Sequence, residues 1–236
     1  MSLLKKSFGV FAVLVWATFA LFSPAQASLQ LSLDAGGGNT ALVVDNLAGD
    51  LNSTAGVVAY AGTLGNFVLN VAIGSSKPAL GSVSDPQIDL YSVNITGWNG
   101  GGTLTMRLTD TGFTSTGATN FSIGIGGSIS SGGTLLYSAF EDNSNIAFGT
   151  ASPICSLSFN SPSFSDLCSN TIGTDSLDSL PLKTVITLPG ALSGVLFNAQ
   201  LTDPPQVPEP SAMLLVGVGL IGLAAWGKRQ IKRRSK

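Results

Sequence analysis

Apolar and polar residues alternate at every second position in several windows between residues 28 and 206. Successive side chains of a β-strand point to opposite faces of the sheet, so this alternation is typical of strands that bury one face. No window of ten residues in this region carries the 3.6-residue apolar stripe of a helix. The region is therefore predicted to be all-β. The clearest windows are 29–33, 66–73, 103–109 and 121–126, and further candidates are 56–61, 87–96, 134–140, 182–188 and 194–202.

Glycine-rich turns separate several of these windows. Asn99-Gly100-Gly101-Gly102 lies between two candidate strands and predicts a hairpin, because glycine adopts the positive φ that tight turns need. Gly132-Gly133-Thr134-Leu135 echoes Gly101-Gly102-Thr103-Leu104 and suggests a second hairpin of the same kind. Strands spaced about 8–12 residues apart favour one antiparallel β-sandwich, jelly-roll or Ig-like, over residues 28–206.

The first 27 residues follow the plan of a secretory signal peptide. A basic start at residues 5–6 precedes an uncharged run over 8–22, and Ala25 and Ala27 place the expected cleavage before Ser28. A helix made from that run would be about 22 Å long, shorter than the roughly 30 Å hydrocarbon core of a bilayer. An uncleaved membrane anchor is therefore the less favoured alternative, and we predict export through the inner membrane.

Residues 207–236 combine three elements in order. The strip Val207, Pro208, Glu209 and Pro210 precedes an uncharged apolar segment that predicts one transmembrane helix over 211–227. The basic end 228–236 is expected to stay in the cytoplasm, because positive residues are retained on that side of the membrane. Its stop-transfer residues are Lys228, Arg229, Lys232, Arg233 and Arg234.

Val-Pro-Glu-Pro followed by a short apolar helix and a basic end resembles the PEP-CTERM sorting signal of Gram-negative bacteria. The resemblance covers residues 207–236. It implies that exosortase, an integral-membrane cysteine protease or transpeptidase, cuts near the Pro-Glu-Pro. It also implies that the tail anchors the protein in the membrane only transiently, before the protein reaches the cell surface or the extracellular space. An ordinary single-pass anchor with a Pro-rich spacer is the alternative.

Charge and composition argue against several functions for residues 28–206. Three basic residues face twelve carboxylates there, so the clustered Lys and Arg that bind nucleic-acid phosphates are missing. The chain has no His, which removes the commonest general base. Glu141 is the only Glu of the region, and its neighbours Asp142 and Asn143 favour an exposed acidic turn over a catalytic pair. We therefore predict no catalytic residue and no enzyme activity.

Cys155 and Cys168 are the only cysteines of the chain. In an exported protein a pair of cysteines is normally oxidised, so we predict a disulfide that closes a Ser-rich loop over 156–167. A reactive thiol is the alternative, but no His or Lys lies nearby in the sequence to activate it.

Two segments carry the oxygen ligands that Ca²⁺ prefers, Asp45-Asn46 with Asp50, and Glu141-Asp142-Asn143. Neither has the spacing of an EF-hand loop, so Asx-rich turns are the favoured interpretation. We predict no metal site and no cofactor, with Ca²⁺ binding as the alternative.

These features together predict an exported, non-catalytic surface or extracellular-matrix protein. Exosortase is its expected partner, and a structural or adhesive role in exopolysaccharide or biofilm is its expected function. The alternative is a carbohydrate- or calcium-binding β-sandwich module, to which Trp98 could contribute by stacking on a sugar ring. Capping of the core edge is the favoured interpretation of Trp98.

Overall fold

The computed structural model describes residues 29–114, 117–174 and 177–203. Within these residues it contains twelve β-strands and no helix, which confirms the predicted all-β class. The strands are β1 (Gln30–Asp34), β2 (Thr40–Val44), β3 (Val57–Leu64), β4 (Phe67–Ser75), β5 (Gln87–Gly97), β6 (Gly102–Phe113), β7 (Gly117–Ile129), β8 (Thr134–Glu141), β9 (Ser152–Phe159), β10 (Ser163–Thr174), β11 (Asp178–Leu188) and β12 (Gly194–Thr202).

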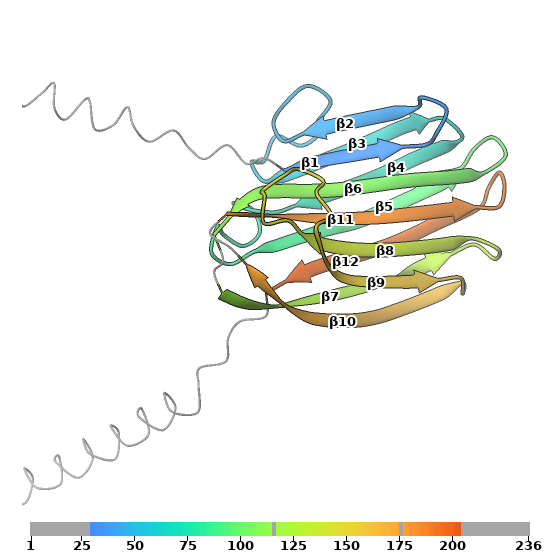
Figure 1. Cartoon of the computed structure of the whole chain (residues 1–236). Coiled ribbons are helices and arrows are strands. Elements are labelled where there is room, and N and C mark those ends of the chain that lie inside the picture. The colour runs from blue at the N-terminus through green and yellow to red at the C-terminus, as the bar shows by residue number, and fades with distance from the viewer. Residues whose placement is uncertain (1–28, 115–116, 175–176, 204–236) are drawn as a thin grey trace, which may run out of the picture. The chain divides into compact units, whose positions relative to one another are not determined.

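The strands form two six-stranded sheets in which all paired strands are antiparallel. Sheet A has the order β2-β1-β6-β11-β8-β9, and sheet B has the order β10-β7-β12-β5-β4-β3. Figure 1 shows the two layers packed face to face as a sandwich, as predicted. One apolar core lies between them, to which Met106 and Leu182 of sheet A and Ile88 and Phe121 of sheet B contribute.

The strands that the alternation missed are edge strands. β2 and β9 lie at the two edges of sheet A, and β10 lies at one edge of sheet B. An edge strand has a neighbour on one side only and covers less of the core, so its sequence need not alternate strictly. β10 illustrates this, because Phe164 and Thr174 are its only buried residues.

The two glycine-rich turns are not hairpins, contrary to the prediction. Each carries the chain from sheet B to sheet A, the first between β5 and β6 and the second between β7 and β8. A Cβ on Gly101 (φ 72°) would collide with the backbone of Leu188 and Gly190, and Gly132 (φ 80°) lies beside Pro189. Both glycines have the positive φ that was expected, and at Gly101 the close approach of the chain after β11 also leaves no room for a Cβ.

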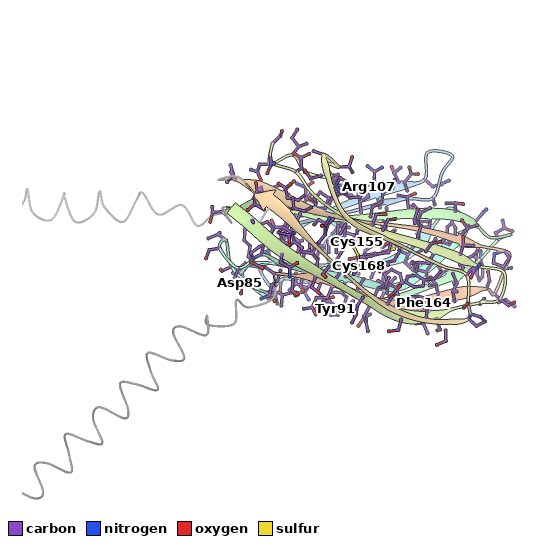
Figure 2. All side chains as sticks on the ribbon, turned by 60° about the horizontal axis from the view of Figure 1, so that its bottom comes forward. Asp85, Tyr91, Arg107, Cys155, Phe164 and Cys168 are labelled. Carbon is purple, nitrogen blue, oxygen red and sulfur yellow. A yellow bond between two sulfur atoms is a disulfide. The ribbon has the colours of Figure 1, made fainter. Side chains whose placement is uncertain are left out.

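The predicted disulfide between Cys155 and Cys168 is present. Its surroundings differ from the prediction, because residues 156–167 are mostly strand and belong to β9 and β10. These strands are consecutive edges of different sheets, so the disulfide joins sheet A to sheet B (Figure 2). The stacked rings of Phe159 and Phe164, with centroids 4.6 Å apart, close the same edge beside the connecting turn.

Candidate functional site

A groove runs along the outer face of sheet B, over β5, β12 and β7. It consists of three adjoining hollows of about 470, 440 and 370 Å³. Asn198 lines the first two hollows and Leu196 lines the second and third, so the hollows are continuous along the strands. Figure 2 shows Tyr91, which lines the first hollow, on the opposite side of the sandwich from Arg107 of sheet A.

Glycines in β7 make one side of the groove hollow. Gly124 and Gly126 occupy alternate positions between the buried Ile123 and Ile125, so they lie on the outward face and present no side chain there. A Cβ on Gly126 would meet no atom nearer than the Phe164 carbonyl oxygen, 3.7 Å away. The groove therefore exists because positions that could hold side chains hold none.

Polar side chains from neighbouring strands line the groove in cross-strand rows. Gln200 of β12 lies directly opposite Asp89 of β5 and opposite Gly124 of β7. Further along, Leu196 lies opposite Asn94 on one side and Ser128 on the other. Side chains directly opposite each other on one face lie about 4.5–5.5 Å apart, so each row can present its groups to one ligand.

A β-bulge between β5 and β12 shapes the middle of the groove. Tyr91 and Ser92 together oppose Asn198, and Ser92 adopts a φ of 54°. The Ser92 backbone N–H donates to Oδ1 of Asn198 at 2.7 Å, which satisfies the donor that the bulge takes out of the ladder. The bulge turns the chain after Tyr91, so that Ser92 also faces the groove.

Asp89 is the one carboxylate among the residues that line the groove, and no Lys or Arg lines it. Burial raises the pKa of Asp89 to about 6. The remaining polar groups are amides and hydroxyls, including Asn94, Thr96 and Ser128. Groups of this kind can donate to and accept from the hydroxyls of a neutral polar ligand, and the half-buried ring of Tyr91 can pack against its apolar surface.

Two exposed hydrophobic residues lie at the far end of the groove. Leu192, which lines the third hollow, is 88% exposed, and its N–H donates to the Gly97 carbonyl at 2.8 Å. Trp98 follows Gly97 directly in the chain and is 66% exposed. The interpretation that Trp98 caps the core edge is therefore wrong. The Trp98 N–H bonds to the Asn66 carbonyl at 2.7 Å, which holds its backbone while the ring faces solvent.

The carboxylates of the first candidate calcium loop accept hydrogen bonds from the backbone of the loop and of the segment that leads into β3. Asp50 accepts backbone hydrogen bonds from Asn46, Asn52 and Ala59 at 2.9–3.1 Å. Oδ2 of Asp45 accepts from the Gly56 N–H at 2.8 Å. This arrangement matches the interpretation of Asx-rich turns.

The second candidate loop is not the exposed acidic turn that we predicted. Glu141 is fully buried and Asp142 is 5% exposed, and only Asn143 faces solvent. Glu141 is buried because β8 continues to this residue. Asp178, at the start of β11, lies beside it and contributes to its electrostatics.

The residues predicted for export and sorting lie outside the described part of the chain. This holds for Ala25, Ala27 and Ser28, for the Val207–Pro210 strip, for the transmembrane helix over 211–227 and for the basic end. In the residues that the structure does describe, no helix has the length and hydrophobicity to cross a membrane.

Comparison with protein families identifies the tail. The family model for the PEP-CTERM protein-sorting motif matches residues 206–230. The chain carries a PEP-CTERM sorting motif. The match begins one residue before the strip predicted from Val207 and ends at Gln230, so it includes the first three residues of the basic end. In a PEP-CTERM protein this motif implies export and processing by exosortase, and it leaves the chemistry of the β-sandwich undefined.

Other comparisons add little to this. No curated protein matches the chain. Among solved structures, TmCBM61 in complex with β-1,4-galactotriose is 9% identical, with a TM-score of 0.25, covering 55% of this chain and 83% of that one. The C-terminal CBM6 of LamC from Zobellia galactanivorans is 13% identical, with a TM-score of 0.24 and coverages of 47% and 79%. The PA14 domain of the antifreeze protein MpAFP is 11% identical, with a TM-score of 0.34 and coverages of 77% and 84%. Scores this low carry no argument about fold or function.

The groove was only partly foreseeable. The window 121–126 shows Gly124 and Gly126 at the positions opposite the apolar face, which is the signal of a strand with a bare outer surface. Asp89, Asn198 and Gln200 carry no such signal, because only the order of the strands brings them together.

Proposed function

We propose that this PEP-CTERM protein is exported, processed at its tail by exosortase, and acts without catalysis at the cell surface or in the extracellular matrix. Its β-sandwich binds polysaccharide along the groove of sheet B and has an adhesive role there. The proposal of polysaccharide binding is supported by the groove. It is an open, elongated surface whose polar lining consists of amides, hydroxyls, one tyrosine and the carboxylate of Asp89, interspersed with apolar residues.

The shape of the groove suits a polymer. From Asp89 to Thr96 it follows β5 over seven residue steps, or about 20 Å at the usual rise of a strand. Because the groove lies on the open face of a sheet, a chain can rest along it without a free end having to enter. A matrix polysaccharide presents such internal stretches in large numbers.

The charges favour a neutral glycan over an acidic one. The groove has no cation to pair with a uronate or sulfate, and Asp89 would repel either group when ionised. The whole exported region is acidic, with three basic residues against twelve carboxylates, which repels polyanions at longer range.

The same lining supports binding without hydrolysis. Glycosidases use two carboxyl groups on opposite sides of the scissile bond, and Asp89 has no second carboxylate among the lining residues. A single carboxylate among amides is better suited to accepting hydrogen bonds from sugar hydroxyls.

Affinity electrophoresis tests the binding. The processed protein, purified from exporting cells, is run through gels that contain neutral glucans, galactans or mannans, with alginate as the acidic comparison. We expect at least one neutral polysaccharide to retard the protein and alginate to leave its mobility unchanged. Unchanged mobility in every neutral polymer, or retardation by alginate alone, would refute the proposal.

Intact mass tests the sorting. In cells that contain exosortase, the protein is expected to lack residues 1–27 and the apolar tail, and in cells without the enzyme it should retain the tail in the membrane fraction. A Pro208→Ala/Pro210→Ala variant should behave like the strain without exosortase. Pro204→Ala/Pro205→Ala, a matched proline pair just upstream of the motif, should be processed normally.

A further inference from the structure

Two buried carboxylates and an amide meet at the start of β11. An isolated antiparallel bridge joins Asp142, just after β8, to Ser179 of β11, with hydrogen bonds of 3.0 and 3.1 Å in the two directions. The bridge holds Glu141 beside Asp178 at the start of the strand. Glu141 is 0% exposed and Asp178 is 1% exposed, so both carboxyl groups are removed from bulk water.

The side-chain amide of Asn143 faces both carboxyl groups. With its nitrogen turned inward, Asn143 donates to Oε1 of Glu141 at 2.5 Å and to Oδ1 of Asp178 at 3.2 Å. With its oxygen turned inward, three oxygens from three side chains converge at the same point. Three converging oxygens repel one another unless a cation lies between them.

Glu141 also has an oxygen that its neighbours do not satisfy. The carboxyl group of Glu141 has a side-chain hydrogen bond with Ser152, but its Oε2 is buried and has no hydrogen-bond partner among the described residues. A buried acceptor without a partner destabilises the folded state, and does so more strongly when it is charged, so native proteins rarely retain one without a function or a bound ion.

The basic residues of the described region do not supply the missing charge. Lys77 pairs with Asp110 at 2.7 Å and lies 4.0 Å from the centroid of the Phe113 ring. Arg107 and Lys183 are register partners on the neighbouring strands β6 and β11, and Arg107 is exposed on the outer face of sheet A. In the described residues no salt bridge reaches Glu141.

We propose that Glu141, Asn143 and Asp178 form a binding site for one Ca²⁺ ion. All three side chains offer oxygen, which hard cations prefer, and there is no His or free Cys in the described region to favour a transition metal. Ca²⁺ accepts irregular coordination more readily than Mg²⁺, and water can complete its shell on the exposed side of Asn143. No group of three His, Cys, Asp or Glu side chains in the described region is placed to hold a metal. The third protein ligand at this site must therefore be the side-chain amide oxygen of Asn143.

The ion would clamp the β8–β9 connection to the first residues of β11. This role is independent of the groove, which lies on the outer face of sheet B and shares no residue with the cluster. With two carboxylates and one open side, the site resembles extracellular Ca²⁺ modules in its ligand set, for which dissociation constants of about 10⁻⁴–10⁻³ M are usual.

Thermal unfolding of the full chain in mild detergent tests the proposal. The protein is treated with EDTA at about pH 8 and then melted alone, with about 10 mM CaCl₂, or with MgCl₂ at the same concentration. We expect Ca²⁺ to raise Tm by about 3–6 °C and Mg²⁺ to have less than half of that effect. Native mass spectrometry should count one Ca²⁺ per chain.

Two variants decide whether this cluster is responsible. Glu141→Gln should lose the Ca²⁺-dependent shift and the bound ion, whereas Asp166→Asn, which changes an exposed carboxylate on β10, should keep both. If Glu141→Gln fails to fold, ion counting on the unaltered chain still decides. Absence of bound Ca²⁺, or a shift that survives Glu141→Gln, overturns the proposal. So does stabilisation of the unaltered chain by acid alone with no response to Ca²⁺, because Glu141 and Asp178 would then share a proton.

Discussion

The backbone N–H of Ser92 donates to the side-chain oxygen of Asn198 across a β-bulge, at 2.7 Å. Asn198 thereby supports the left-handed backbone of Ser92 and forms part of the groove itself. The bulge that interrupts the β5–β12 ladder is thus also the structure that shapes the proposed glycan surface.

Replacing Asn198 with Ala should lower the free energy of unfolding by about 1 kcal/mol, because the Ser92 donor loses its acceptor in a strained turn. Gln200→Ala is the matched control on the same strand face, and its side chain makes no hydrogen bond within the described residues. Urea denaturation of both variants measures the difference. Equal stabilities would show that water replaces Asn198 without cost.

Gly126→Val should block the groove and leave the fold intact. The position has an ordinary strand φ and space for a Cβ, so we expect a change in stability within about 0.5 kcal/mol. Polysaccharide affinity should fall at least tenfold in affinity electrophoresis. Gly173→Val on β10, where a Cβ would meet no atom within 4 Å, is the control and should bind normally. Normal binding by Gly126→Val would place the glycan site elsewhere.

Removing the disulfide should destabilise the sandwich by about 3 kcal/mol, as expected for a cross-link over a separation of 13 residues. The double variant Cys155→Ser/Cys168→Ser should melt at the same temperature with and without reductant. The unaltered chain should approach that temperature only when reduced. A reductant-insensitive unaltered chain would contradict a structural role for this bond.

Metal-free stability should fall as the pH rises toward neutrality. Burial raises the pKa of Asp89 to about 6, and burial, with Asp178 and Asp142 nearby, raises the pKa of Glu141 to about 7. Both groups hold protons more tightly in the folded chain, so the stability they contribute is complete below about pH 4 and is lost as the pH passes about 6 and then 7.

Measuring Tm in EDTA between about pH 4 and pH 8 tests whether stability falls as the pH rises. Asp89→Asn should remove the lower part of the decline, and Asp166→Asn should leave the profile unchanged. Added Ca²⁺ should flatten the upper part. A Tm that rises with pH between 5 and 8 would contradict the buried state of both groups.

The match between sequence and structure follows how deeply each strand is buried. β1, β6 and β11 lie inside sheet A, and their windows alternate clearly because one face of each must be apolar. β10 lies at an edge of sheet B and exposes polar residues on both of its faces, so the same rule fails there.

Some properties were determined locally in the chain. Alternation at period two specified an all-β domain, and two cysteines without competitors specified a disulfide. The order of elements from Val207 onward specified a PEP-CTERM sorting motif, which its family model confirms over residues 206–230. Each of these properties depends on residues that are close in the sequence or, for the disulfide, on two cysteines that have no other cysteine to pair with.

Only the tertiary structure decided which strands became neighbours. It turned the two glycine-rich turns into crossings between sheets, buried Glu141 against a residue 37 positions away, and placed Gln200 between Asp89 and Gly124. The reason is physical: a strand's periodicity reports which of its faces is buried, but hydrogen-bonded pairing between strands depends on distant segments whose register no local pattern encodes.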